Sequence, residues 1–351
     1  MSSTRALGSI IRFCLFSLLT LWTQPSWGQQ PVPPVLTEER VMMGTQVIIK
    51  VIDPDQEKAK KAIEAAFQEI HRLELLMSNF IPSTPLSQIN QQAGKSPVSV
   101  GPELFHIVER SVEFSKMSDG AFDISFASVG KLWNFRQGVL PSPDAIKNQL
   151  PFVDYSQIKL DEESWSVYLP HSEMEIGLGG IGKGYAVDRA MEVLSSFGIQ
   201  NAMAMAGGDM LVRGRKGDEP WQVGLRDPDD EKKILAVLPL ENQAISTSGD
   251  YERFFIKDGV RYHHILDPET GYPARLCRSV SILASAATTS DALTKPVFIL
   301  GPERGMALVE RLEGVEAIIV DSTGKIWLSS GLQSLGDLQT SPEKAEEEEV
   351  E

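Results

Sequence analysis

Residues 177–188 read GLGGIGKGYAVD, a cluster of glycines around one lysine that runs directly into a helical pattern. Glycine lets the backbone take up unusual conformations and approach a ligand closely. A helix that begins in such a loop directs unpaired N–H groups and a partial positive charge toward it. Lys183 adds a full charge, so the stretch predicts a cradle for a phosphate or pyrophosphate; a purely structural turn is the alternative. The glycine spacing fits neither the dinucleotide fingerprint nor the Walker loop.

Helix and strand signals mix irregularly on both sides of this stretch. Helices are predicted over 63–77, 102–117, 186–197 and 303–313, and a further helical segment opens at Asp291 and is disturbed by Pro296. Strands are predicted over 41–52, 202–206, 210–214, 221–226, 234–240, 254–257, 279–284, 316–320 and 325–328. Because strands and helices do not alternate strictly, the pattern predicts an α+β fold.

The N-terminus has the features of a secretory signal peptide. Arg5 and Arg12 precede or open an apolar run from residue 10 to residue 22, and small residues suit cleavage after Gly28. The run is too short for a comfortable membrane span, and an uncleaved N-terminal anchor is the alternative. The sequence therefore predicts an exported protein, periplasmic or in the cell envelope, after removal of residues 1–28.

Three further segments follow the predicted signal peptide. Residues 29–36 form a proline-rich leader, residues 37–335 one large domain, and residues 336–351 an acidic tail predicted to be disordered. The formal net charge is −15, and the body stays acidic without the tail, which argues against nucleic acid and anionic membranes as partners. Once the signal peptide is removed, Cys277 is the only cysteine, so no intrachain disulfide is expected.

Titratable residues in segments separate from the glycine-rich stretch suggest chemistry on a pyrophosphate. The pair His263-His264 offers a general base, because imidazole titrates near neutrality. Asp123 and Asp291 offer carboxylates for a magnesium ion, which would neutralise phosphate charge. Each feature has an ordinary alternative: hydrogen-bonded histidines, a helix cap at Asp291 and a core position for Phe80.

An ordered set of motifs spread over nearly the whole mature chain resembles the ApbE-type flavin transferases, the FAD:protein FMN transferases. The motifs are Met43-Gly44-Thr45, Met77 to Phe80 with Ser87 and Asn90, Ser118 to Asp123, Gly177 to Asp188, Ala206 to Gly208, Thr247 to Tyr251, His264 to Pro273 and Ser279 to Gly301. The resemblance implies an α+β domain, residues 37–335, of two interwoven subdomains with mixed or antiparallel sheets and packed helices. The FAD site would lie between the subdomains.

The same resemblance implies an activity and a set of site residues. The family cleaves FAD, attaches FMN through a phosphoester bond to a threonine or serine of a redox protein, and releases AMP. His264 corresponds to the family's base, and the backbone carbonyl of Gly180 together with Asp291 corresponds to magnesium ligands. The FAD site would be lined by Met43, Phe80, Ala121, Phe122, Asp123, Lys183 and Ile265. A membrane would be involved only through the acceptor or an uncleaved N-terminus.

The sequence departs from the family pattern at two positions. Gly177 stands where the family usually has an aspartate beside the cofactor, and Lys295 stands where it has a metal-binding threonine. The ammonium group of Lys295 would either repel Mg²⁺ or stand in for its charge. Thr294 is the neighbouring hydroxyl, turned by about 100° on a helix. A degenerate FAD-binding protein and an FAD pyrophosphatase giving FMN and AMP are the alternative functions.

Overall fold

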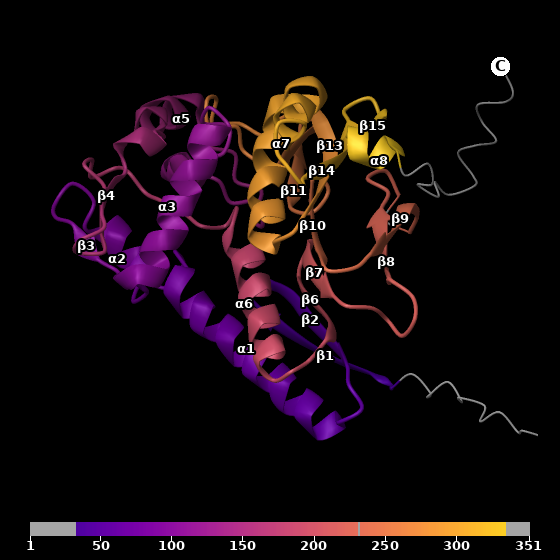
Figure 1. The fold of residues 1–351 in the computed structure, drawn as a ribbon. Helices are drawn as coiled ribbons and strands as arrows, with labels where there is room; N and C mark the ends of the chain where they lie inside the picture. The colour runs from indigo at the N-terminus through magenta and orange to yellow at the C-terminus, as the bar shows by residue number, and fades with distance from the viewer. Residues whose placement is uncertain (1–32, 231, 335–351) are drawn as a thin grey trace, which may run out of the picture. The chain divides into compact units, whose positions relative to one another are not determined.

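A central antiparallel sheet carries the other elements of this computed structural model, which describes residues 33–230 and 232–334 (Figure 1). The predicted signal peptide and acidic tail lie outside these residues, as do residues 29–32 of the leader. The sheet has eight strands in the order β1-β2-β6-β7-β10-β13-β14-β15. Their bounds are Val35–Met42, Thr45–Ile52, Asn201–Ala206, Asp209–Arg213, Gln243–Gly249, Cys277–Ala284, Glu316–Asp321 and Ile326–Leu328.

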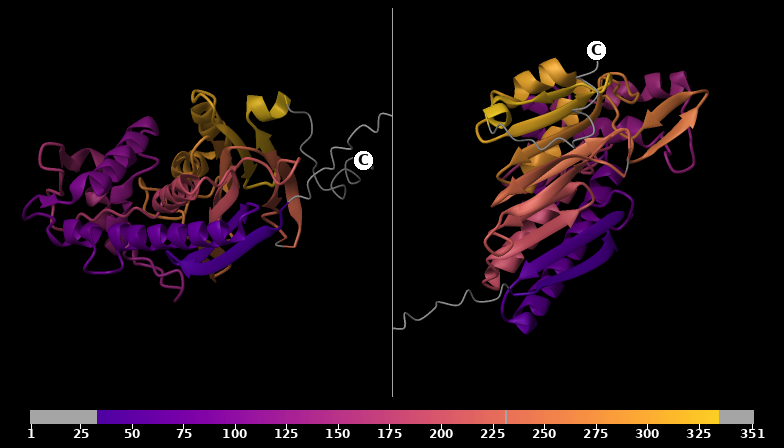
Figure 2. Two further views of the ribbon diagram at one scale, coloured as in Figure 1. Left: turned by 60° about the horizontal axis from the view of Figure 1, so that its bottom comes forward. Right: turned by 90° about the vertical axis from the view of Figure 1, so that its right-hand side faces the viewer.

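Three long helices cover one face of this sheet, as the left view of Figure 2 shows. They are α1 (Gln56–Met77), α6 (Gly182–Ser196) and α7 (Ala287–Val309). Alternate strand residues such as Ile49, Ala204 and Ile282 join the helices' apolar side chains in the main core. This alternation follows from the pleat, which directs successive side chains to opposite faces. Helix α1 buries Ile63, Phe67, Ile70, Leu73 and Met77, as its helical spacing predicts.

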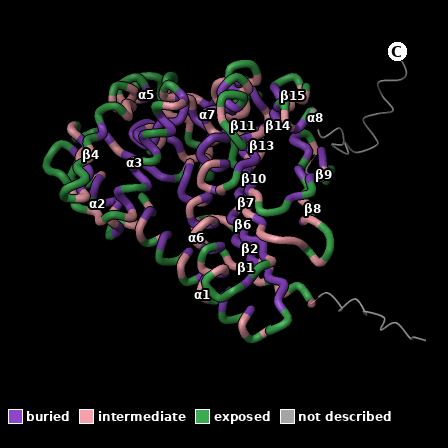
Figure 3. Tube along the Cα trace, in the orientation of Figure 1, coloured by how far each residue is buried: buried purple, intermediate pink, exposed green. Residues whose placement is uncertain are grey.

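The opposite face of the sheet has a smaller core of its own. The hairpin of β8 (Trp221–Arg226) and β9 (Ile234–Leu240) packs there, together with Leu332 of α8 (Ser330–Ser334). Met203, Ile245 and Ile318 are the strand residues that point to this side. Because both faces are covered, middle strands of the sheet are largely buried, as the tube in Figure 3 shows for β6 and β10.

The remaining elements lie beyond the ends of the long helices. They are α2 (Pro85–Gln91), α3 (Gly101–Met117), α4 (Ala127–Gly130), α5 (Pro143–Gln149), three short 3₁₀ turns, the small sheet β3-β5-β4 (Val98–Ser99, Ser166–Tyr168, Lys159–Asp161) and the hairpin β11–β12 (Phe254–Lys257, Val260–His263). The hairpin packs Phe255 and Tyr262 near Trp133. The predicted α+β class is confirmed, with antiparallel pairing in every described sheet.

Several predicted boundaries were wrong, for local reasons. Residues 41–52 are not one strand: the chain reverses at Met43 and Gly44, which both have positive φ, and β1 pairs with β2. The first strand begins at Val35, inside the segment assigned to the leader. Strand β10, rich in serine and threonine, gave no strand signal and was missed. Helix α7 is continuous through Pro296 and kinks at Gly301.

Candidate functional site

The glycine-rich stretch forms the predicted turn into a helix, and α6 begins at Gly182, four residues earlier than predicted. The N–H of Gly177 donates to the Ile124 carbonyl (2.9 Å), and the N–H of Gly182 donates to the Leu178 carbonyl (2.7 Å). A side chain at Gly182 would meet Met77 at 3.7 Å, and one at Gly177 would meet Asn79 at 3.6 Å. The end of α1 therefore lies against the loop.

Helices α6 and α7 cap each other. Asp188 of α6 accepts hydrogen bonds from the N–H groups of Ala287 (2.7 Å) and Thr288 (2.8 Å), in the first turn of α7. In return, Oδ2 of Asp291 accepts from the N–H of Gly184 (2.9 Å), in the first turn of α6. Each carboxylate thus satisfies N–H groups that a helix start leaves without partners. Asp291 does cap a helix, but a different one from the helix that carries it.

The two helices come this close because Gly184 has no side chain. A Cβ atom there would lie 2.2 Å from the Ala287 carbonyl oxygen and 2.7 Å from Cβ of Asp291. Such distances are far inside van der Waals contact, so the close approach requires glycine at this position. Of the glycines in the stretch, Gly184 is therefore the one that holds the two helix starts together.

Four alternating charges meet at these helix starts. Lys183 forms an ion pair with Asp209 of β7, and its Nζ lies 3.7 Å from Oδ1 of Asp291. Nζ of Lys295 pairs with the same Oδ1 and donates to the Asp291 backbone oxygen at 2.8 Å. Both carboxylates are almost completely buried, whereas the two lysine side chains remain about one-fifth exposed. The lysine side chains are therefore the exposed part of the network.

Burial and the neighbouring charges shift the pKa values of this network. For Lys183, burial favours the neutral amine, but the charges of Asp209 and Asp291 outweigh it and raise the pKa. Burial also acts on Asp291, and there the two lysines prevail and hold its pKa well below the ordinary value. Burial, together with the charge of Asp291, raises the pKa of Asp209. The Lys183 ammonium group and the Asp291 carboxylate are therefore charged at neutral pH.

The two adjacent histidines differ in their hydrogen bonds. The His263 ring is satisfied on both sides, by the Ala274 carbonyl at 2.7 Å and by the Ile265 N–H at 3.3 Å. In His264 the atom Nδ1 is buried and has no hydrogen-bond partner. Burial and the charge of Arg253, with smaller contributions from Lys183 and Lys295 among others, lower the pKa of His264 to about 3. His264 is thus a neutral imidazole within the field of the site's cations.

The predicted cofactor residues around Asp123 lie in the protein interior. Phe122 is 4% exposed and Ala121 is 9% exposed, and a side chain at Gly180 would meet Phe122 at 3.0 Å and Lys295 at 3.8 Å. Both Asp123 oxygens are already used: Oδ1 by the N–H and hydroxyl of Ser125, Oδ2 by the N–H of Tyr155. Burial raises the pKa of Asp123. Asp123 therefore shapes this turn, and the structure brings Phe122 to the loop.

The other predicted cofactor residues have different surroundings. Phe80 is 89% exposed, so its alternative interpretation as a core residue was wrong. The Met43 N–H donates to Glu74 at 2.7 Å, which fixes the β1–β2 turn on α1. Arg253 reaches the Gly44 carbonyl at 3.4 Å and accepts the His264 N–H through its own carbonyl at 3.0 Å, so this turn lies beside the histidine segment. Ile265 is buried in the main core.

The residues expected to bind magnesium do not fit a magnesium ion. Of the two Asp291 carboxylate oxygens, one accepts the Gly184 N–H and the other contacts the Lys295 ammonium. The Thr294 hydroxyl is fully buried, donates to the Asp291 carbonyl and accepts from Ser248, each at 2.8 Å. Among the described residues no cluster of His, Cys, Asp or Glu has the arrangement of a metal site. Magnesium prefers carboxylate and neutral oxygen ligands, and an ammonium group repels it.

Two residues of the site, Asp209 and Arg253, were not predicted from the sequence. Asp209 directly follows the glycine pair Gly207-Gly208, and Arg253 lies two residues after the Thr247–Tyr251 motif. A carboxylate directly after two glycines and before an apolar strand was the available signal for Asp209. Nothing in the sequence pairs Arg253 with Gly44, which lies far away along the chain.

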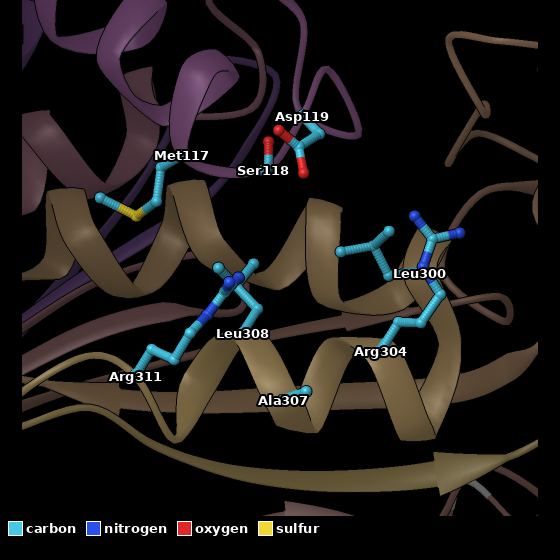
Figure 4. Close-up of a pocket in the computed structure, with 8 residues that line it drawn as sticks. All are labelled: Met117, Ser118, Asp119, Leu300, Arg304, Ala307, Leu308 and Arg311. Carbon is cyan, nitrogen blue, oxygen red and sulfur yellow. The ribbon is translucent and has the colours of Figure 1, made fainter.

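A small cavity opens elsewhere, between the end of α3 and the second half of α7 (Figure 4). Its volume is about 250 Å³, and Met117, Ser118, Asp119, Leu300, Arg304, Ala307, Leu308 and Arg311 line it. None of the predicted site residues is among them.

In the part of the chain that is described, no helix combines the length and apolar character needed to cross a bilayer.

The fold is α+β, and at the glycine-rich start of α6 two partly exposed lysines lie beside the buried Asp291. Such an arrangement suits a phosphate-bearing ligand. The ApbE family model matches residues 43–319, and the chain therefore belongs to the ApbE family. It is 36% identical to an FAD:protein FMN transferase of Treponema pallidum, over 77% of this chain and 80% of that protein. It is 32% identical to an FAD:protein FMN transferase of Klebsiella pneumoniae, over 84% of this chain and 92% of that protein.

Solved structures agree with this assignment. The crystal structure of the ApbE protein of Thermotoga maritima superposes with a TM-score of 0.80 at 33% identity, covering 86% of this chain and 99% of that one. The apo flavinyl transferase ApbE of Pseudomonas stutzeri gives a TM-score of 0.75 at 25% identity, covering 87% and 97%.

Proposed function

We propose that the protein is an FAD:protein FMN transferase, a function that its relatives carry in their names. FAD is cleaved at its pyrophosphate, FMN is joined by a phosphoester bond to a threonine or serine of an acceptor redox protein, and AMP leaves. The observation that carries the proposal is the meeting of Lys183 and Lys295 with Asp291 at the glycine-rich start of α6, with the neutral His264 within the field of both cations.

The lysine side chains supply most of the attraction for the pyrophosphate. The N–H groups of Gly182 and Gly184, which a helix start would offer to an anion, donate to Leu178 and Asp291 instead. The side chains of Lys183 and Lys295 are partly exposed, and each ammonium group is held by an ion pair with a buried aspartate. Fixed cations of this kind stabilise the negative charge that develops on a leaving phosphate.

In the proposed reaction His264 acts as the general base. The acceptor hydroxyl oxygen bonds to the phosphorus of the FMN half, and the bond from that phosphorus to the bridging oxygen breaks. The bridging oxygen leaves with its electron pair as part of AMP, and the hydroxyl proton passes to the imidazole. The pKa of about 3 belongs to the protein without substrate. The negative charges of FAD offset the cations and raise this pKa toward the range of an effective base.

The magnesium ion expected from the family resemblance takes no part in this proposal, because Lys295 contacts the carboxylate oxygen that a metal needs. Export belongs to the proposal as well. It is supported by the charged, apolar and small-residue pattern of residues 1–28, and it places the acceptor in the periplasm or cell envelope.

The decisive test incubates the purified protein with FAD and an acceptor redox domain that carries an exposed threonine. Mass spectrometry of the acceptor is expected to show an FMN adduct, and chromatography is expected to show AMP in equal amount. His264→Asn should lower the rate by about 10²–10⁴ without loss of the fold. AMP and FMN formed without an acceptor would indicate a pyrophosphatase instead, and bound FAD without any product would indicate a binding protein.

A further inference from the structure

The ammonium group of Lys295 is held by the protein, and its side chain remains partly exposed. It follows Asp291 by one turn of α7, which places the two side chains on the same side of the helix. Nζ contacts the backbone oxygen and Oδ1 of Asp291. An ammonium group has three donors, so one remains for a ligand. The Lys295 side chain also lies against the glycine-rich loop: its Cε would be 3.8 Å from a Cβ atom added at Gly180.

The same contacts block a divalent ion. Oδ1 of Asp291 already contacts the Lys295 ammonium group, and Nζ of Lys183 lies 3.7 Å from the same oxygen. A metal ion bound to Oδ1 would therefore lie beside two ammonium groups. Oδ2 is committed to the Gly184 N–H, which holds the two helix starts together. The neighbouring hydroxyl of Thr294 is buried between two protein oxygens. Like charges at such short range repel strongly in a partly buried site.

The charge balance leads to the same conclusion. The network pairs two lysines, Lys183 and Lys295, with two aspartates, Asp209 and Asp291. With a neutral residue at position 295, one lysine would face two aspartates, and a bound cation would be one way to restore the missing positive charge. The lysine supplies this positive charge as part of the chain.

We propose that Lys295 is a built-in cation that replaces a divalent metal ion beside the pyrophosphate, so that FAD binds and reacts without added metal. The inference rests on the proposed function. It concerns only the source of positive charge in the site, so its failure and that of the flavin transfer are distinguishable.

Calorimetric titration with FAD, in EDTA and in Mg²⁺, tests the proposal. Wild type should bind FAD with the same affinity in both, within about twofold. Lys295→Thr should bind about 10- to 100-fold more weakly in EDTA and recover in Mg²⁺, because a charged hydrogen bond is lost and a metal site is opened. Lys295→Met, which has neither charge nor hydroxyl, should be weak in both. Lys147→Met on the exposed surface of α5 is the control for removing a lysine.

A metal readout independent of activity completes the test. Mn²⁺ titrations followed by electron paramagnetic resonance, with saturating FAD and an FAD-only blank, should show protein-bound Mn²⁺ for Lys295→Thr but not for wild type. Thermal unfolding checks that the variants are folded. Wild-type FAD binding or transfer that requires Mg²⁺ would overturn the role of Lys295 and leave the flavin transferase standing. Absence of FAD binding under every condition would overturn both.

Discussion

The candidate site has an inner part and an outer part that differ in physical character. The inner part consists of Lys183, Asp209, Asp291 and Lys295, whose carboxylates are buried and whose charges are paired. The outer part is Phe80, whose side chain is 89% exposed and is not packed in the protein core. Buried charges must be satisfied with or without ligand, so the inner part couples stability to binding. The exposed outer part has no such coupling.

Removing one inner charge should have the largest effect. Lys183→Met leaves Asp209 buried without its cation, and we expect the free energy of unfolding in urea to fall by about 3–5 kcal/mol. FAD binding should be lost as well. The double variant Lys183→Met/Asp209→Asn should regain most of the stability but not the binding. If the single variant were as stable as wild type, the coupling assigned to the inner part would be refuted.

The second-largest effect is expected from the close packing of α6 against α7 at Gly184. Gly184→Ala places a methyl group 2.2 Å from the Ala287 carbonyl oxygen, so α6 and α7 must separate. We expect about 1–3 kcal/mol lower stability and weaker FAD binding, measured by urea unfolding and calorimetry. Gly179→Ala in the same loop meets no protein atom within 4 Å and should leave the stability unchanged. Equal effects of the two substitutions on stability would argue against the close approach of the two helices.

His264 should give the site a pH dependence. Its pKa is 6.5 in the unfolded chain and about 3 in the folded protein, so below pH 6.5 the unfolded state binds the extra proton. Above pH 6.5 His264 does not lower the free energy of unfolding. As the pH decreases below 6.5, protonation of the unfolded state lowers the free energy of unfolding, by about 2 kcal/mol at pH 5. Urea unfolding from pH 7 to 5 should show a smaller loss for His264→Gln. Saturating FAD should also reduce the loss in wild type; identical profiles throughout would contradict the assignment.

The outer part should give the smallest effect. Phe80→Ala removes an exposed ring, so the free energy of unfolding should stay within about 0.5 kcal/mol of wild type. If the ring stacks on the flavin, FAD affinity should fall about 2- to 10-fold, as calorimetry would show. Ile256→Ala, a 63% exposed position on β11, is the matched control and should leave both quantities unchanged. A loss of stability at Phe80 would erase the distinction between the two parts.

Local patterns allowed much of the fold to be predicted. The spacing in α1, the glycine-rich turn into α6 and the strands β8, β9 and β11 depend on neighbours in sequence, and the structure confirms them. Strand β10 was missed because its serines and threonines resemble a loop. In the sheet their hydroxyls pair with those of neighbouring segments, as Thr247 does with Ser281 at 2.8 Å.

The sequence by itself determined the family, the α+β class and the glycine-rich turn into a helix with its lysine. It also presented Lys295 as a departure with two opposite interpretations. Only the tertiary structure set α6 against α7, so that Asp188 and Asp291 cap each other's helix and Asp209 pairs with Lys183. The physical reason is range: propensity and spacing act over a few residues, whereas charges and helix ends are satisfied by whichever groups the packed core brings close.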